Sequence, residues 1–314
     1  MTDLAARLLY ATAALLTRLP WRWLMRLADA LGARALRHDS REARVVECNL
    51  ALAYPELLPG QRAQLQQSIL RNTARQLIET LRLWTRPHAE NLALIREQHG
   101  VEHLDAAIAA GNGVIVVAPH HGNWELLNQW LASRTPLAIL YAPPESAVGE
   151  AFLQRVRADD AQASRVTQVR AEGAGVRQLF KRLAAGGVVG ILPDQQPKLG
   201  DGEFGPFFGV EALTMTLIGR LAARSGAAVL VAWCERIDGG DRGARGPSFA
   251  LHVAPAPAEV ASTDARISVT ALNAAIERVA RRDPTQYQWT YKRFSLRPTG
   301  RGEDNPYWPR CYRR

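Results

Sequence analysis

The feature that most limits the fold is a short β-branched run, Val114-Ile115-Val116-Val117, set between Gly113 and Pro119. A continuous apolar run bounded by turn residues is typical of a strand buried on both faces of a parallel sheet. Similar runs follow at 137–141, 188–192 and 227–233, with helical patterns between them, notably at 176–184 and 213–223. This strand–helix alternation predicts an α/β sheet with a substantial parallel component.

The part before this alternation, up to about residue 95, has a helical pattern throughout. Asp39 or Ser40 is placed to cap one helix, and residues 61–84 carry apolar side chains close to a helical period. We therefore expect a helical N-terminal part (31–95) joined to the α/β sheet in one domain (31–314).

Residues 1–30 predict a helix that associates with a membrane. The Leu- and Ala-rich stretch 4–19 is interrupted by Arg7 and Arg18, whereas a spanning helix needs about 20 apolar residues. No positive region precedes it and no convincing cleavage site follows, which argues against a signal peptide. Residues 21–27 interleave Trp21, Trp23 and arginines with aliphatic residues, which favours a helix lying in the membrane interface. An amphipathic helix packed on the core is the alternative.

The net charge of the chain indicates anionic partners but does not distinguish among their classes. The formal net charge is +9, which attracts nucleic acid, phospholipid headgroups, phosphorylated substrates or acidic carrier proteins. The three cysteines (Cys48, Cys234 and Cys311) form no Cys-x-x-Cys pair. This argues against a zinc knuckle and fits a reducing compartment.

The chemistry of the chain is concentrated in Ala118-Pro119-His120-His121-Gly122-Asn123-Trp124-Glu125. This stretch follows a buried strand and opens a helix, and ligands of open α/β sheets bind at the carboxyl ends of strands. His120 can act there as a general base, since its ordinary pKa lies near neutrality. Glu125 lies one helical turn on, where its carboxylate can face the imidazole and fix its tautomer. Because there is no Gly-x-Ser-x-Gly, P-loop or His-Glu-x-x-His motif, the base is expected to act on a hydroxyl of the substrate.

Other interpretations of this stretch remain at this point. A His-x4-Glu spacing is weak alone, and His120 and His121 could cap the helix or bond buried carbonyls. A metal site at His120, His121 and Glu125 is disfavoured, because adjacent histidines on a turn tend to diverge and no further ligand is obvious. We expect no metal and no cofactor.

The block His120 to Glu125 resembles the signature of the bacterial lipid A biosynthesis (secondary) acyltransferases. These belong to the glycerophospholipid acyltransferase group marked by His-x4-Asp/Glu. Further blocks resemble that family in the same order along the chain, at 44–50, 54–56, 78–84, 190–197, 206–209 and 273–298. Ordered blocks through nearly the whole chain make the resemblance far more specific than the histidine spacing.

The resemblance implies a three-layer α/β/α fold with a helical N-terminal region. It also implies a transferase at the cytoplasmic face of a Gram-negative inner membrane, which moves an acyl chain from acyl carrier protein to a hydroxyl of a lipid A precursor. The site residues that it implies are His120 and Glu125 as catalytic residues, and Arg157 (with Arg165 as second choice), Asp194 and Arg293 as oxyanion, orienting or acceptor-binding candidates.

The sequence departs from the family pattern at a few places. Tyr291 and Ser295 stand where basic residues are commoner, and His121 replaces a usual aromatic residue. The acceptor could therefore be another membrane lipid, such as a glycerophosphate, an ornithine lipid or a glycolipid. A non-catalytic basic protein that binds anionic membranes is the alternative from a different class. The expected partners are acyl carrier protein, an anionic lipid acceptor and the membrane surface, and not nucleic acid.

Overall fold

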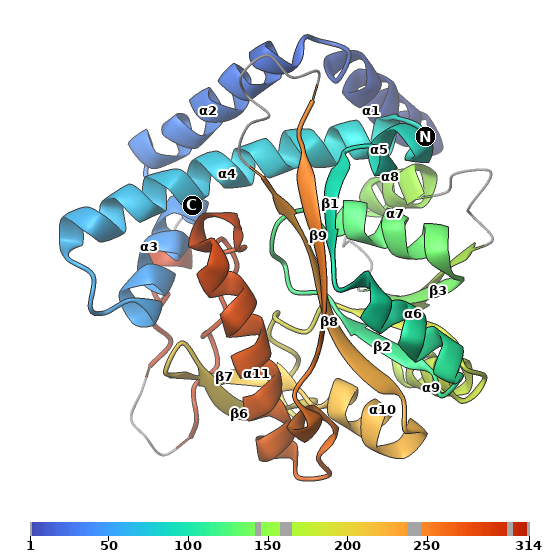
Figure 1. Ribbon diagram of the computed structural model, residues 1–314. Helices are drawn as coiled ribbons and strands as arrows, with labels where there is room; N and C mark the ends of the chain where they lie inside the picture. Colours follow the sequence, from blue (N-terminus) through green and yellow to red (C-terminus); the bar gives the residue numbers. More distant parts are fainter. Residues whose placement is uncertain (1, 142–145, 158–164, 238–245, 300–303, 313–314) are drawn as a thin grey trace.

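The computed structural model describes residues 2–141, 146–157, 165–237, 246–299 and 304–312. Within them a mainly parallel sheet lies between layers of helices (Figure 1). The strands are β1 (Ile95–His99), β2 (Val114–Val117), β3 (Leu137–Tyr141), β4 (Val166–Arg170), β5 (Val188–Ile191), β6 (Gly202–Phe207), β7 (Val210–Met215), β8 (Ala228–Arg236) and β9 (Phe249–Pro255). The α-helices are α1 (Thr2–Leu16), α2 (Trp21–Arg37), α3 (Arg41–Ala53), α4 (Pro59–Thr85), α5 (His88–Leu92), α6 (Val101–Ala110), α7 (Trp124–Arg134), α8 (Ala147–Arg157), α9 (Gly173–Ala184), α10 (Leu217–Ser225) and α11 (Ala265–Arg282).

The large sheet has seven strands in the order β1-β9-β8-β2-β5-β3-β4. Strands β8, β2, β5, β3 and β4 are parallel to one another, whereas β9 runs antiparallel to β8 and parallel to β1. Strand β2 lies between β5 and β8, and all four of its residues are buried. The predicted parallel α/β sheet is therefore confirmed, and β2 delivers the chain to the middle of its carboxyl edge.

Helices cover both faces of the sheet. Successive strand residues point to opposite faces, so Val114 and Val116 pack in the cluster that includes α6 and α7. Ile115 and Val117 pack in the cluster that includes α9, α10 and α11. The arrangement is compatible with the expected three-layer α/β/α fold.

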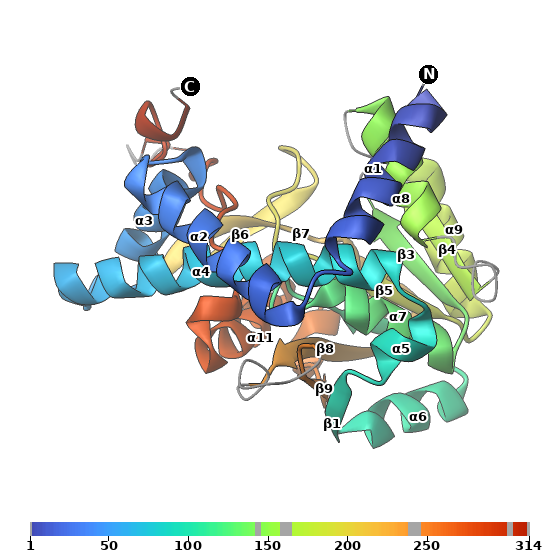
Figure 2. The ribbon, with the colours of Figure 1, turned by 90° about the horizontal axis from the view of Figure 1, so that it is seen from above.

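The N-terminal part is helical, as the sequence predicts. The Ser40 hydroxyl caps α3 by accepting a hydrogen bond from the Ala43 backbone N–H at 3.2 Å. Helices α1 and α2 lie on the outer side of the long helix α4 (Figures 1 and 2). The expected boundary at residue 30 falls inside α2, since this helix continues to Arg37. The apolar side of α2 packs on Ile78 of α4.

Several strands were not anticipated, and one helix begins later than expected. Strands β1 and β4 are mostly exposed or half-buried and carry no continuous apolar run. Residues 210–215 form β7, which pairs with β6, so that the helix expected at 213–223 begins at Leu217. The β6–β7 turn places Phe208 and Gly209 at φ of 52° and 74°, the positive angles that two-residue hairpin turns require.

Candidate functional site

The loop after β2 carries His120, and its backbone is fixed from several directions. The backbone N–H of Gly122 donates to the Gln286 carbonyl at 3.0 Å, and that of Asn123 to the Cys234 carbonyl at 2.7 Å. Gly122 has a φ of +61°, and a Cβ there would lie 2.0 Å from the Cys234 oxygen. Only glycine therefore fits this close approach to β8.

Two further hydrogen bonds hold the same loop. The Gln288 backbone N–H donates to the His120 carbonyl at 2.9 Å, and the Gln76 side chain of α4 donates to the Gly122 carbonyl at 2.7 Å. Asn123 then caps α7 by accepting from the Leu126 N–H at 3.2 Å. The position of His120 is therefore set by the sheet, by α4 and by the C-terminal segment together.

The carboxylate of Asp194 holds the His120 imidazole. The His120 Nδ1 lies 2.7 Å from Asp194 Oδ1, and the His120 backbone N–H donates to Oδ2 at 2.8 Å. The Trp124 ring meets the imidazole edge-on, with 4.9 Å between ring centroids. A carboxylate can only accept, so Nδ1 carries the proton and Nε2 holds the lone pair. In this structure the Gln195 side-chain amide, 3.4 Å away, donates to that lone pair.

Asp194 reaches His120 because their strands are neighbours. Val117 pairs with Ile191, so the residues that follow β2 and β5 emerge side by side. Burial raises the pKa of Asp194, but the charge of His120 and the hydrogen bonds from its ring and backbone N–H outweigh burial. The pKa of Asp194 therefore lies below its ordinary value, and its side chain is a carboxylate at neutral pH.

Glu125 lies in the first turn of α7, as expected, and is 5% exposed. It borders a small cavity whose other walls include Trp84, Ile139 and Val156. The expectation that Glu125 fixes the His120 tautomer needs correction, because Asp194 occupies Nδ1. His120 and Asp194 are 74 residues apart, so no local sequence pattern indicates their contact.

The two candidate arginines, Arg157 and Arg165, lie at different positions in the fold. Arg157 is the last residue of α8, and its side chain lies outside the described part of the structure. Arg165 directly precedes β4 and donates to the Ser133 carbonyl at 3.1 Å. Since β4 is parallel to the other central strands, Arg165 lies at their amino edge, opposite His120. This position argues against Arg165 as the functional arginine, and the choice between the two arginines stays a prediction.

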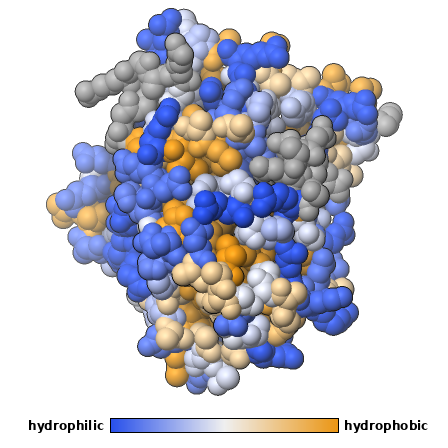
Figure 3. Space-filling view, turned by 45° about the vertical axis from the view of Figure 1, so that its right-hand side comes forward, coloured by the Kyte–Doolittle hydropathy of each residue, from blue (hydrophilic) through white to orange (hydrophobic). Residues whose placement is uncertain are grey.

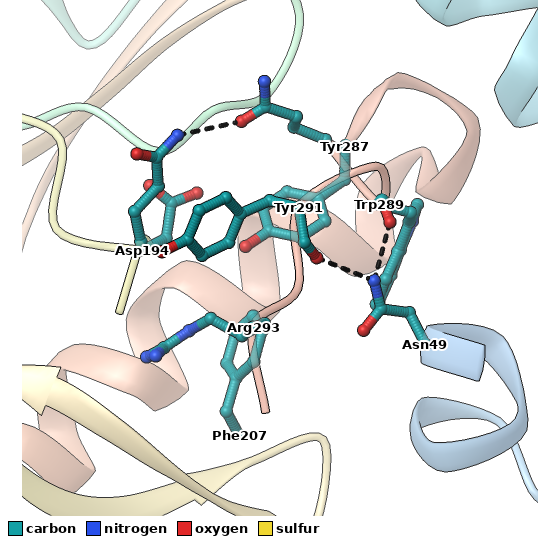
Figure 4. Close-up of a pocket in the computed structure, with 9 residues that line it drawn as sticks. Asn49, Asp194, Phe207, Tyr287, Trp289, Tyr291 and Arg293 are labelled. Atoms are coloured by element: carbon teal, nitrogen blue, oxygen red, sulfur yellow. Dashed lines mark hydrogen bonds between the residues drawn. The ribbon is translucent and has the colours of Figure 1, made fainter. Parts of the chain in front are cut away.

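Arg293 lines a small cavity beside Asp194 and is 4% exposed (Figure 4). Its guanidinium donates to the Leu213 carbonyl and to the Thr214 hydroxyl. Burial lowers the pKa of Arg293, and nearby tyrosines and Asp194 oppose that shift. In this structure Arg293 binds the β7 backbone, and its expected contact with an acceptor stays a prediction.

The side chains of Asp194, Tyr287 and Tyr291 converge on this cavity (Figure 4). Burial, and then the Asp194 carboxylate, raises the pKa of Tyr287, so that its phenol stays protonated. The Tyr291 hydroxyl accepts from the Gln196 backbone N–H at 3.1 Å, and Ser295 donates to the Lys292 carbonyl at 3.0 Å. The Tyr291 and Ser295 side chains therefore make hydrogen bonds to the protein backbone.

The N-terminal helices expose apolar side chains in two stripes. On α1, Leu4, Leu8 and Leu15 are 60–69% exposed, and on α2 the exposed residues are Trp23, Leu27 and Leu31. Spacings of four, seven and eight residues put each set on one helix face. Trp21 faces the protein and is 7% exposed, so the expectation that it enters a membrane is wrong.

The surface as a whole is mixed. On the face in Figure 3, hydrophobic side chains gather in separate patches between hydrophilic ones. Across the described ranges, no helix combines the length and the hydropathy needed to cross a bilayer.

Comparison with known proteins identifies the family of this chain. Residues 4–295 match the family described as bacterial lipid A biosynthesis acyltransferase. The chain is 27% identical to the lipid A biosynthesis lauroyltransferase of Escherichia coli K12, over 91% of this chain and 90% of that protein. It is 28% identical to the lipid A biosynthesis palmitoleoyltransferase of the same organism, over 90% and 88% of the two chains. A shorter match of 35 residues, 51% identical, links it to a phosphatidylinositol mannoside acyltransferase of Mycobacterium tuberculosis, over 11% of each chain. The chain is therefore an acyltransferase and belongs to the bacterial lipid A biosynthesis acyltransferase family.

Proposed function

We propose that this protein transfers a fatty acyl group from acyl carrier protein to a hydroxyl of a lipid A precursor, with His120 as the general base. The observation that carries this proposal is the 2.7 Å contact between His120 Nδ1 and Asp194. It fixes the tautomer in which Nε2 can accept a proton. The His120 side chain is 12% exposed, whereas that of Asp194 is 2% exposed. The base therefore reaches the surface while its partner stays buried.

In the proposed reaction, His120 Nε2 takes the proton of the acceptor hydroxyl as its oxygen attacks the thioester carbonyl carbon. The carbon–sulfur bond then breaks, and the thiolate leaves with the proton that the imidazolium returns. The Asp194 carboxylate stabilises the imidazolium between these two steps. The acyl group ends as an ester, and the carrier ends as a free thiol.

Further site residues are assigned as part of the same proposal. Glu125 supports the site from the first turn of α7, and Arg157 is the candidate for stabilising the oxyanion. Arg293 donates hydrogen bonds to β7 beside Asp194. To bind a phosphate of the acceptor, its guanidinium would have to give up these hydrogen bonds.

The donor and the place of action follow from charge and from the relatives. Carrier proteins are acidic, and a net charge of +9 raises the rate at which they meet this chain. The names of the two Escherichia coli relatives point to lipid A as the acceptor class. We place the protein at the cytoplasmic face of the inner membrane, held there by the stripes on α1 and α2.

The function is tested with the purified protein, an acylated carrier protein and a lipid A precursor, and the lipid products are weighed by mass spectrometry. We expect the precursor to gain the mass of one acyl group for each carrier thiol released. Parallel reactions offer acyl-coenzyme A as donor, and a glycerophosphate, an ornithine lipid or a glycolipid as acceptor. A faster reaction with one of these acceptors would replace lipid A in the proposal.

The α2 stripe is expected to drive membrane association. Replacing Trp23, Leu27 and Leu31 together by glutamine keeps the buried side of α2 intact. A fully buried Leu-sized side chain is worth about 1.5–3 kcal/mol, so we expect vesicle binding to fall by at least about 10-fold. Co-sedimentation with vesicles of anionic phospholipid measures the change.

Leu199, which is 77% exposed outside the N-terminal helices, provides a matched control as Leu199→Gln. This control should bind vesicles like the wild type. Wild-type binding should also survive a high-salt wash, because salt screens charge but does not weaken apolar burial. Full release by salt would show that charge alone holds the protein on the membrane. Unchanged binding of the triple variant would remove the α2 stripe from the attachment and leave the α1 stripe or charge as its source.

A further inference from the structure

His121 is fully buried, although its side chain is polar. Neither of its ring nitrogens makes a hydrogen bond to any described residue. A buried polar group without a partner costs about 1–3 kcal/mol. The position therefore needs a compensating interaction that an aromatic side chain would not need.

The carboxylate that faces this ring is Glu235 on β8. The His121 Nε2 lies 3.7 Å from Glu235 Oε1, beyond hydrogen-bond distance but close enough for an ion pair when the ring is protonated. The other carboxylate oxygen, Oε2, faces Arg282 at 3.3 Å and His252 at 3.6 Å. Burial raises the pKa of Glu235, but His121 and Arg282 outweigh burial and lower it to about 2. Glu235 is therefore a carboxylate at neutral pH, with a separate oxygen for His121.

The two adjacent histidines hold the loop from different sides. The His120 ring binds Asp194 after β5, and the His121 ring faces Glu235 on β8. Strands β5 and β8 flank β2 on opposite sides. A twist of the loop that took His120 off Asp194 would therefore also move His121 relative to Glu235.

We propose that His121 and Glu235 form a positioning pair for this acyltransferase, which holds the loop so that His120 stays aligned on Asp194 and on the acceptor hydroxyl. This inference rests on the proposed role of His120 as the base. Neither residue of the pair touches the reacting atoms. Their effect is on geometry, and a displacement of about 1 Å can cost about 100-fold in rate.

The test is a double-mutant cycle with His121→Phe, Glu235→Gln and the double variant. Phenylalanine keeps an aromatic ring of similar size at 121, and glutamine keeps the shape of residue 235. We expect each single change to lower kcat by about 10–100-fold with little change in the acceptor KM. The double variant should be no slower than the slower single variant, because the second change removes an interaction that is already lost.

Two further variants separate positioning from general stability. Arg282→Gln removes a partner of Oε2 but leaves the His121 side of Glu235, and it should keep the wild-type kcat. His121→Gln can donate an amide N–H to Glu235, and it should recover part of the kcat that phenylalanine loses. The Tm of every variant is measured in parallel, so that kcat is compared among folded proteins.

The outcomes of this inference and of the proposed function can be told apart. Additive losses in the cycle, or singles with lower Tm but wild-type kcat, would overturn the positioning pair. If His120→Ala is inactive in the same assay, the proposed base survives such a result. If His120→Ala is as active as the wild type, the proposed function itself fails.

Discussion

Replacing His120 by alanine is expected to lower kcat for acyl transfer by about 10²–10⁴-fold, the usual contribution of a general base. The acceptor hydroxyl would then have no group at Nε2 to take its proton during attack. The fold should survive, because the loop is held mainly by backbone bonds at His120, Gly122 and Asn123. Steady-state kinetics with both substrates saturating gives kcat directly.

His103, an exposed histidine on α6, provides the control as His103→Ala. Its kcat should equal that of the wild type, which excludes a general effect of losing a histidine. Retention of a large part of the activity by His120→Ala, with a wild-type Tm, would remove this residue from the mechanism.

Asp194→Asn is expected to lower kcat by up to about 10⁴-fold, the loss known when a triad aspartate becomes asparagine. An amide at 194 can donate a hydrogen to Nδ1. This would favour the tautomer with its proton on Nε2, where the base must accept. The amide oxygen can still accept the His120 backbone N–H, as the carboxylate does, so we expect little change in Tm.

Glu125→Gln is the informative comparison for this variant. Both carboxylates are buried near the site, and Asp194 is the one whose Oδ1 lies 2.7 Å from Nδ1. We therefore expect Glu125→Gln to lose less kcat than Asp194→Asn. A reversed order of the two losses would return the tautomer-fixing role to Glu125.

The sequence predicts the centre of the fold well, because its signal is local. The run 114–117 is continuously apolar because the strand is buried on both faces of the sheet. Since His120 follows this run, the sequence also predicts that His120 lies at the carboxyl edge of the sheet. The cap at Ser40 and the long helix at 61–84 are also local patterns, and both are confirmed.

What the sequence does not reveal depends on the order of strands and on the facing of helices. Nothing near Asp194 shows that β5 lies beside β2, so its contact with His120 appears only in the fold. The same holds for Arg165, which strand direction places at the far edge. Trp21 and Trp23 have similar neighbours in the sequence, so their burial cannot be distinguished from it. The packing of α2 on α4 buries Trp21 and leaves Trp23 exposed.

The bonds that hold the His120 loop also set when activity can arise during synthesis. The loop is tied to Gln286 and Gln288, in a chain of 314 residues. A ribosome must therefore have passed residue 288 before all of these ties can form. Until then the histidine sits on a loop that lacks its C-terminal support. A growing chain should accordingly leave the cell's pool of acyl thioesters untouched until Gln286 and Gln288 can reach the loop.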